Sequence, residues 1–142
     1  MKKTISIISC CLMICLLFIG CSTNNTESKE VAIIKNDLKS YFSCYEKGDF
    51  EGMKKFCTKN YVDEYFHDGD VFGNLTAKLV DFEEIKYDET AMKYTALVQI
   101  ECMPTKISAL YNRDKPDEPV NTYMDLVVSV DNGNAVIEAF AY

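Results

Sequence analysis

Residues 31–66, VAIIKNDLKSYFSCYEKGDFEGMKKFCTKNYVDEYF, decide how the rest of this chain folds. The apolar residues of the first half recur every three or four positions, a spacing that places them on one face of an α-helix. These residues are Val31, Ile34, Leu38, Tyr41, Phe42 and Tyr45. Gly48 suits the C-terminal cap of this helix, and Asp49 suits the N-cap of a second one. We therefore predict a long amphipathic helix and a turn, followed by shorter helices that need a sheet to pack against.

The shorter helices carry their own apolar faces. Phe50, Met53 and Cys57 share one side of the second helix. A third helix is predicted from Tyr61 to Phe66, with Asn60 as its cap. Such aromatic stripes usually form core, and that is the first interpretation of this one.

Beyond residue 66 the apolar period changes from helix to strand. Residues 67–74 are rich in Gly and Asp and are predicted as a loop. Residues 79–87 are predicted as the first strand, and a change of parity at 83–84 indicates a β-bulge. Residues 92–103 alternate most clearly, with the even-numbered side chains from Met92 to Cys102 predicted to face the core.

The C-terminal part of the chain is predicted to complete the sheet. Residues 107–111 are assigned to an edge segment and residues 112–119 to a polar loop. Residues 121–130 and 135–142 form the last two strands, joined by a hairpin turn at 131–134. The expected fold is α+β, with N-terminal helices packed on a curved antiparallel sheet of four to five strands.

The outer face of this sheet is unusually apolar. Six side chains fall on the parity opposite to the core: Leu97, Met103, Tyr123, Val127, Val136 and Phe140. Apolar patches of this kind often mark an interface, so a homodimer through the outer face is a further expectation.

The start of the chain has the character of an export signal. Lys2 and Lys3 precede an apolar run from residue 5 to 19, which is shorter than the roughly 20 residues of a membrane-spanning helix. The run ends in Leu-Phe-Ile-Gly-Cys at 17–21, which resembles the lipobox of bacterial lipoproteins, although Leu is more usual than Phe18 at its position. An ordinary signal peptide with an accidental Cys21 is the alternative.

The resemblance to lipoproteins implies a division of the chain. Residues 1–20 would be the signal peptide, Cys21 the lipidated first residue of the mature protein, residues 21–30 a flexible tether and residues 31–142 one domain. The protein would then be anchored by its lipid at the outer side of the cell membrane. Two of the 15 Lys and Arg residues leave with the signal, so 13 basic side chains face 22 acidic ones, a formal charge of −9. This charge argues against a nucleic-acid partner and against electrostatic docking on anionic lipid.

The cysteines of the mature domain do not form a disulfide framework. Cys44, Cys57 and Cys102 remain after the signal and the lipidation site are set aside, and three is an odd number. A bridge between Cys57 and Cys102 is conceivable, but three buried thiols are the favoured interpretation.

The order of elements resembles the nuclear-transport-factor-2-like superfamily, whose fold is a cystatin-like α+β cone. The residues that carry the resemblance are the helical stripe, Gly48-Asp49-Phe50, and the terminal hairpin at Asn132-Gly133. The superfamily includes ketosteroid isomerase, polyketide cyclases, domains attached to penicillin-binding proteins and many lipoproteins. One fold hosts many functions, so the resemblance implies an architecture and no particular activity.

Catalytic and metal-binding residues are weakly indicated. An isomerase of this kind needs a carboxylate base and a phenol or acid donor, for which Asp68 or Asp70 and Tyr41 or Tyr45 are candidates. Asp125 is a candidate second acid, but its parity places it on the face away from the helices. His67, the only histidine, has Asp68 and Asp70 as neighbours, which is too few ligands for zinc. We predict no catalytic residue, no metal site and no cofactor.

The sequence favours binding as the function. Seven rings could approach one region of the cone, and Tyr41, Tyr45, Tyr65 and Tyr94 are the predicted ligand-binding residues. A small apolar ligand or an envelope protein is the expected partner. The alternatives are an isomerase- or cyclase-like enzyme, and a domain with a filled core that acts by contact alone.

Overall fold

The computed structural model describes residues 27–141. The signal peptide, Cys21 and the first part of the tether lie outside the described residues, so these assignments stay predictions. Among the residues described, no helix is both long and apolar enough to cross a membrane.

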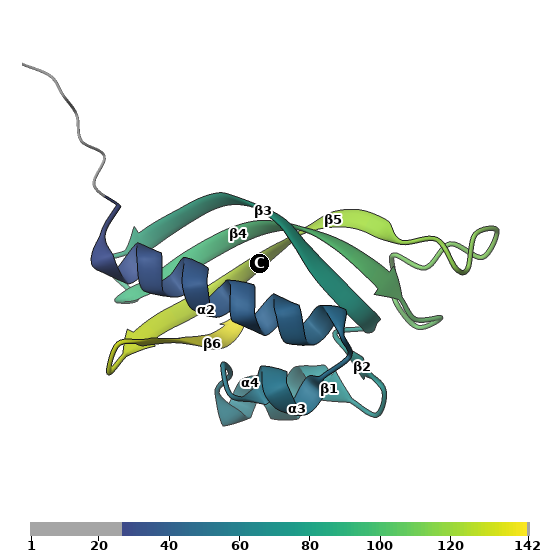
Figure 1. Ribbon diagram of the computed structural model, residues 1–142, viewed down its shortest axis with the longest axis horizontal. Helices are drawn as coiled ribbons and strands as arrows, with labels where there is room; N and C mark the ends of the chain where they lie inside the picture. The colour runs from purple at the N-terminus through teal and green to yellow at the C-terminus, as the bar shows by residue number, and fades with distance from the viewer. Residues whose placement is uncertain (1–26, 142) are drawn as a thin grey trace, which may run out of the picture.

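Helix α2, Lys29–Glu46, runs along one face of the sheet (Figure 1). Ser28 caps its first turn, because the side-chain hydroxyl accepts a hydrogen bond from the Val31 amide at 3.2 Å. The predicted stripe is confirmed from Ile34 to Tyr45, where five side chains are buried. Gly48 has a φ of 68°, the left-handed conformation that ends the helix as predicted.

Two short helices follow. Helix α3, Phe50–Lys54, begins at the predicted cap, where Asp49 accepts a hydrogen bond from the Gly52 amide at 2.9 Å. Helix α4, Lys59–Tyr65, begins one residue after its N-cap Thr58, so the prediction of Asn60 as the cap is wrong. The Thr58 hydroxyl accepts from the Tyr61 amide at 3.3 Å, which is the contact of an N-cap side chain with the third helical residue.

The sheet is antiparallel, and the described part of the chain gives it six strands in the order of the sequence. A two-residue pair, β1 (Phe66–His67) and β2 (Asp70–Val71), precedes four long strands. These are β3 (Asn74–Asp88), β4 (Lys93–Pro104), β5 (Val120–Asp131) and β6 (Asn134–Phe140). The predicted fold class, helices on a curved antiparallel sheet, is confirmed.

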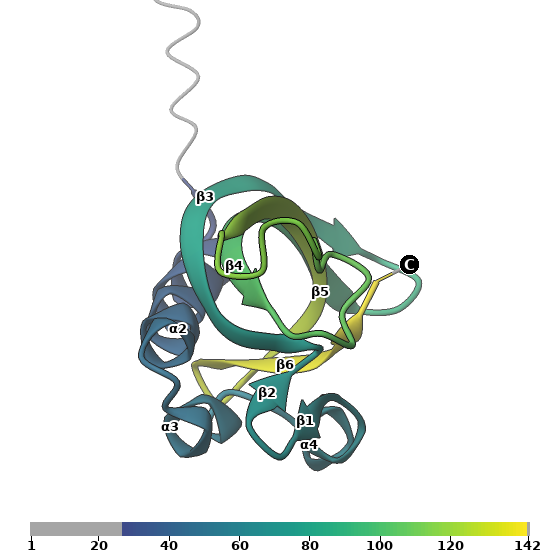
Figure 2. The ribbon, with the colours of Figure 1, turned by 90° about the vertical axis from the view of Figure 1, so that its right-hand side faces the viewer.

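Three register shifts between β3 and β4 accompany the curvature of the sheet. One of them falls between Phe82 and Glu84, at the parity change expected from the sequence. Seen along the strands in Figure 2, the sheet curls strongly, with α2 beside β3 and α3 and α4 near β6. The outer edge of β6 is covered, because Ile137 exchanges backbone hydrogen bonds with Phe56 and Thr58 at 2.7 and 2.9 Å.

The core lies between α2 and the concave face of the sheet. Leu38, Tyr41 and Tyr45 share one buried cluster with Val98 and Ile100 of β4, as the matched apolar stripes predict. The helix is also fixed to β6 by a polar contact, in which the Asp37 carboxylate accepts the Ala135 amide at 2.7 Å.

Several local predictions are wrong. Residues 67–74 are not a loop: they form the β1–β2 pair and the start of β3. Residues 107–111 form turns instead of an edge strand, and Ile107 is 78% exposed. Met92 lies in the β3–β4 turn with a φ of 55° and not in the core. Phe140 is buried, because a register shift between Val127 and Val128 reverses the parity of β6 beyond Ile137.

Candidate functional site

A two-residue turn connects β2 to β3 and positions the side chains of the site. Val71 pairs with Asn74, and the two residues between them, Phe72 and Gly73, have φ values of 53° and 71°. Positive φ at both central positions is the feature of a type I′ hairpin turn. The Asp70 carboxylate accepts the Gly73 amide at 2.9 Å and holds the turn closed. Gly73 is also packed closely, since an added Cβ would lie 3.3 Å from Cβ of Ser108.

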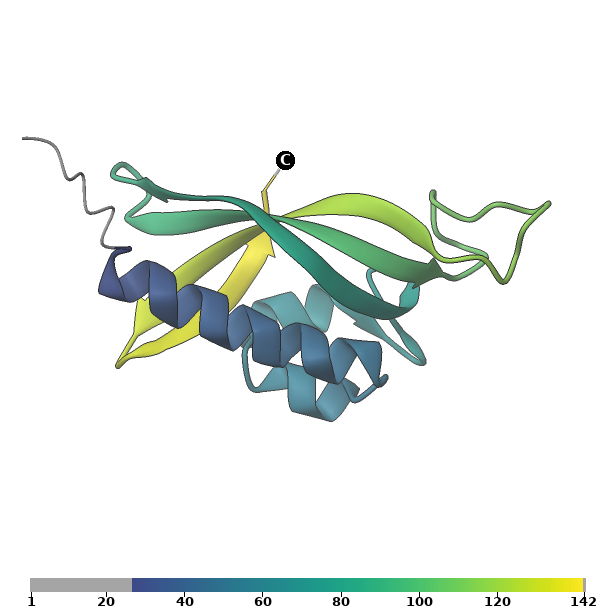
Figure 3. The ribbon, with the colours of Figure 1, turned by 45° about the horizontal axis from the view of Figure 1, so that its top comes forward.

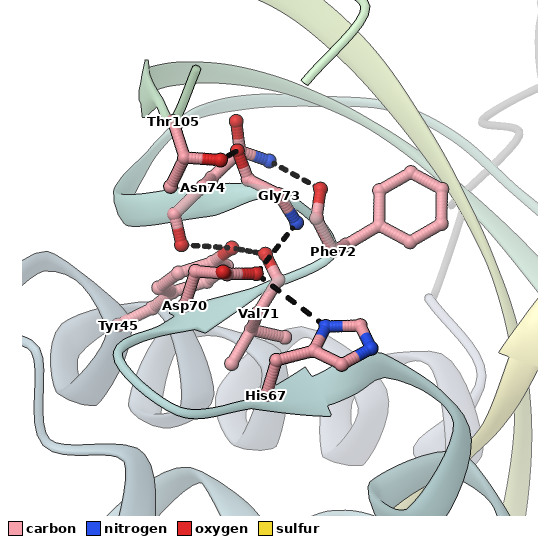
Figure 4. Close-up of polar contacts among 8 residues, drawn as sticks. All are labelled: Tyr45, His67, Asp70, Val71, Phe72, Gly73, Asn74 and Thr105. Atoms are coloured by element: carbon pink, nitrogen blue, oxygen red, sulfur yellow. Dashed lines mark hydrogen bonds and ion pairs between the residues drawn. The ribbon is translucent and has the colours of Figure 1, made fainter. Parts of the chain in front are cut away.

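Tyr45 of the buried core contacts the backbone of this turn. The Tyr45 hydroxyl donates to the carbonyl of Val71 and lies 3.5 Å from that of Asn74 (Figure 4). On the other side, the Thr105 amide and hydroxyl both donate to the Gly73 carbonyl, at 2.8 and 3.1 Å. The turn is therefore fixed between helix α2 and the chain that leaves β4.

A cavity of about 750 Å³ opens beside the turn. Its lining residues include His67 of β1 and Ile107–Leu110 of the β4–β5 connection, the long loop that projects from one end of the sheet in Figure 3. Ile100 of β4 and Met124 of β5 contribute apolar side chains to its wall, and Ile107 and Leu110 of the connection face it as well. The wall is mostly apolar, as expected of a site for a small organic molecule.

Three aromatic rings form one side of the cavity. The Phe140 ring lies 4.0 Å from that of Phe72 and 4.7 Å from that of Tyr65, measured between centroids. Phe72 is 42% exposed, whereas Tyr65 and Phe140 are buried. Phe72 thus presents a ring face at the cavity from a backbone conformation that bulky residues rarely adopt.

The polar atoms of the wall include two hydrogen-bond acceptors without partners. Between residues 27 and 141, the buried side-chain oxygens or nitrogens that lack a partner are Oδ1 of Asn74 and Oδ1 of Asp125, and both residues line the cavity. Asp125 lies on the face of β5 away from the helices, as its parity predicts, since Met124 and Leu126 are buried on the other face. It nevertheless belongs to the cavity wall, which the sequence did not indicate. The pairing with β6 ends at Leu126, and the Ala141 amide then donates to the Asp125 carbonyl at 3.0 Å, which leaves the edge of β5 open from Met124 toward its start beside the cavity.

The structure does not bring the four predicted tyrosines together. Tyr65 lines the cavity. Tyr41 and Tyr45 are fully buried, with the Tyr41 hydroxyl 3.4 Å from that of Tyr61. Tyr94 lies near the opposite end of β4, where its ring is 4.9 Å from that of Tyr87. Tyr41 and Tyr45 therefore belong to the buried core. Besides Tyr65, the aromatic side of the cavity consists of Phe72 and Phe140.

Two of the residues considered for metal binding or catalysis do meet. His67 and Asp70 are paired across the β1–β2 hairpin, with Nδ1 of His67 3.5 Å from Oδ1 of Asp70. Asp70 is buried and His67 is exposed at the cavity rim. Asp68 is exposed in the connecting turn and has no place in the cavity wall. No cluster of three or more metal-ligating side chains occurs within residues 27–141.

The three cysteines that the structure describes carry free thiols, and none of them is bonded to another. Cys102 is buried but Cys44 and Cys57 are half-buried, so the prediction of three buried thiols is correct only for Cys102. Burial raises the pKa of Cys57 to about 12 and also raises that of Cys102. Neither thiol is activated as a nucleophile by these surroundings, since reactive thiols have lowered pKa values.

A second, smaller hollow of about 410 Å³ lies between α2 and β3. Lys39 and Glu46 of the helix and Lys78 and Asp81 of the strand give it a polar rim. It is a surface groove, and its lining includes neither of the residues with unpartnered buried oxygens, Asn74 and Asp125.

Comparison with known proteins adds little. No protein-family model and no curated protein matches the sequence. One solved structure, from Xanthomonas campestris pv. campestris and described as a predicted polyketide cyclase, is similar in arrangement, with 9% sequence identity and a TM-score of 0.41. The match covers 79% of this chain and 93% of the other. A similarity this low indicates no activity for this chain.

Proposed function

We propose that residues 27–141 form a binding module that holds a small, mostly apolar molecule in the cavity beside the Phe72–Gly73 turn. The observation that carries the proposal is the 750 Å³ cavity with its wall of Tyr65, Phe72 and Phe140. The three rings pack against one another, yet Phe72 remains 42% exposed and the space beside the rings is not filled by side chains, as it would be in a close-packed core. The lipobox-like sequence at 17–21 supports a role at the outer side of the cell membrane, with the domain tethered through lipid on Cys21.

A soluble fragment is suitable for testing this. Every residue of the buried core lies between Ile34 and Phe140, so residues 22–142 retain the complete core. The probe is N-phenyl-1-naphthylamine, an uncharged molecule whose fluorescence rises in apolar surroundings. We expect saturable enhancement that corresponds to one site per chain.

A matched pair of variants locates the site. Thr122 lines the cavity and is half-buried on β5, whereas its neighbour Asn121 is exposed and outside the wall. Thr122→Tyr should fill the cavity and abolish the enhancement, and Asn121→Tyr should leave it unchanged. Equal binding by both variants would overturn the proposal, as would a lack of saturable binding in the unchanged fragment.

An enzyme of the isomerase or cyclase type is the second candidate function. The observation in its favour is the His67–Asp70 pair at the cavity rim, because a histidine oriented by a buried carboxylate can act as a general base. The test follows deuterium incorporation next to the carbonyl of 2-tetralone, an apolar bicyclic ketone, in D₂O by NMR. The enzyme hypothesis predicts exchange faster than solvent that is lost in His67→Gln. Exchange at the solvent rate would reject the enzyme hypothesis and leave binding as the proposed function.

A homodimer through the outer sheet face is a separate proposal. Leu97, Val127 and Val136 are half-buried on that face, and Tyr123 is 60% exposed. With Phe140 inside, the face is less apolar than the sequence suggested. Sedimentation of residues 22–142 at micromolar concentration tests it: a dimer that Tyr123→Lys dissociates supports the interface, and a monomer at all concentrations refutes it.

A further inference from the structure

The two unpartnered oxygens of the cavity wall are both hydrogen-bond acceptors. Leaving a buried polar group unsatisfied costs stability, so such groups are uncommon in folded proteins. Of the side-chain atoms described, Oδ1 of Asn74 and Oδ1 of Asp125 are in this state, and both belong to the same cavity. A ligand that donates hydrogen bonds would recover this cost on binding.

The orientation of the Asn74 amide is fixed by the turn. Its Nδ2 donates to the Phe72 carbonyl within the turn at 3.2 Å (Figure 4). Rotating the amide would place Oδ1 against that carbonyl, two acceptors facing each other. The residue is 2% exposed, so Oδ1 is a buried acceptor held in place.

Asp125, the second acceptor, differs from Asn74 in being an ionisable carboxyl. Burial raises the pKa of its carboxyl, and the negative charge of Glu84 raises it further, against the opposing effect of Lys86. Burial deprives this carboxyl of hydrogen bonds to water, so a ligand that donates a hydrogen bond to it would stabilise it. An anionic ligand would add to the repulsion, since the Asp70 carboxylate behind the wall accepts the amide of Gly73, which lines the cavity.

We propose that the cavity selects an uncharged, mostly apolar molecule bearing hydroxyl or N–H groups, with Asn74 and Asp125 as its hydrogen-bond acceptors. This inference rests on the proposed binding function and specifies the class of ligand. Apolar molecules that carry only acceptors, and carboxylates of the same shape, are expected to bind more weakly.

Three competitors of matched shape test the selection. Each displaces N-phenyl-1-naphthylamine from residues 22–142 at neutral pH: 2-naphthol carries a donor, 2-methoxynaphthalene has the same ring system without one, and 2-naphthoate is anionic. One additional hydrogen bond of about 1–1.5 kcal/mol corresponds to roughly five- to tenfold tighter binding of 2-naphthol than of 2-methoxynaphthalene. 2-Naphthoate should be the weakest competitor.

Variants assign the preference to the two residues. Asn74→Leu and Asp125→Leu remove one acceptor each and should reduce the advantage of 2-naphthol while leaving 2-methoxynaphthalene unaffected. Asn121→Leu changes an exposed neighbour outside the wall and should retain the advantage. If Asn74→Leu fails to fold, Asp125→Leu decides, because that side chain is only half-buried.

The outcomes separate this inference from the proposed function. Equal displacement by 2-naphthol and 2-methoxynaphthalene overturns the selection while leaving the cavity a binding site. An advantage that persists in both leucine variants overturns the assignment to Asn74 and Asp125. If the fluorescent probe itself does not bind, the proposed function and this inference fail together.

Discussion

The rings of Phe72 and Phe140 lie 4.0 Å apart between centroids, although Phe72 has a φ of 53°. The left-handed conformation costs a residue with a Cβ roughly 1–2 kcal/mol, and Asn or Gly usually occupies it. The contact with Phe140 returns part of that energy, yet Phe72 remains 42% exposed. A strained residue that keeps an aromatic face at a cavity is suited to binding more than to stability.

The first prediction separates these two roles at Phe72. Phe72→Asn creates an Asn-Gly pair, the most favourable sequence for a type I′ turn. Relief of the strain should offset the lost ring contacts, so urea unfolding should give a free energy within about 1 kcal/mol of the unchanged fragment. Affinity for N-phenyl-1-naphthylamine should fall roughly tenfold, the equivalent of about 1.4 kcal/mol.

Phe140→Ala serves as the comparison for Phe72→Asn. Phe140 is buried against Tyr61 and Tyr65 as well as Phe72, so its removal should cost about 3–5 kcal/mol of stability. If Phe72→Asn were destabilised as much as Phe140→Ala, Phe72 would be an ordinary core residue and our interpretation of the turn would be wrong.

The second prediction tests which face of β4 is inside. Val98 is fully buried and Gln99, its neighbour on the opposite face, is half-buried. Val98→Asp places an unpaired charge in the core and should unfold the domain, since the cost is at least several kcal/mol and total stability is about 5–15 kcal/mol. Gln99→Lys should fold, as circular dichroism would show. Similar loss of structure in both variants would contradict the face assignment.

The third prediction concerns alkaline pH. Burial raises the pKa of Tyr41, Tyr45 and Tyr61 above 10.0, and that of Cys57 to about 12. Above the unfolded-state values of 9.0 for a thiol and 10.0 for a phenol, the unfolded chain loses these protons first and binds fewer than the folded one. Stability is therefore complete below about pH 9 and falls as pH rises, by up to about 1.4 kcal/mol per pH unit for each group.

Urea unfolding at several pH values between neutral and about pH 11 measures this slope. Tyr41→Phe should make the decline above pH 9 less steep, because one buried phenol is removed. Tyr123→Phe, at an exposed ring, is the control and should leave the slope unchanged. A decline that is the same in both variants would show that the buried phenols are not its cause.

The fourth prediction addresses Cys21, which the described residues do not include. If the lipobox-like sequence directs lipidation, Cys21→Ser should release the protein to the medium or leave an uncleaved precursor, seen by fractionation and intact mass. Mature protein retained at the membrane in that variant would contradict the lipid anchor.

The sequence predicts most of the framework because the framework depends on periodicity. Ile34, Leu38 and Tyr45 share a helical face whatever lies opposite, and Val98 and Ile100 alternate as a half-buried strand must. The Asn132-Gly133 turn, with φ of 50° and 80°, is evident from residue type alone.

The site is less predictable because it depends on departures from these periods. Phe72 occupies a left-handed position that its residue type disfavours, so the β2–β3 hairpin resembled a loop. A bulge turns Phe140 inward, and the early end of β6 leaves the start of β5 unpaired beside the cavity, whose wall includes Asp125. Tyr94 shares the core parity of β4, but parity does not indicate which end of a strand holds a cavity. Register and strand length set these features, and both are tertiary properties.

The most direct test of the account locates a bound probe by NMR. ¹⁵N-labelled residues 22–142 are titrated with N-phenyl-1-naphthylamine, and amide shifts are mapped on the sequence. We predict the largest changes at Gly73, Ser108 and Thr122, which surround the cavity, and little change at Lys39 and Val80 in the groove between α2 and β3. Shifts concentrated in that groove, or no shifts at saturating probe, would contradict a binding site beside the Phe72–Gly73 turn.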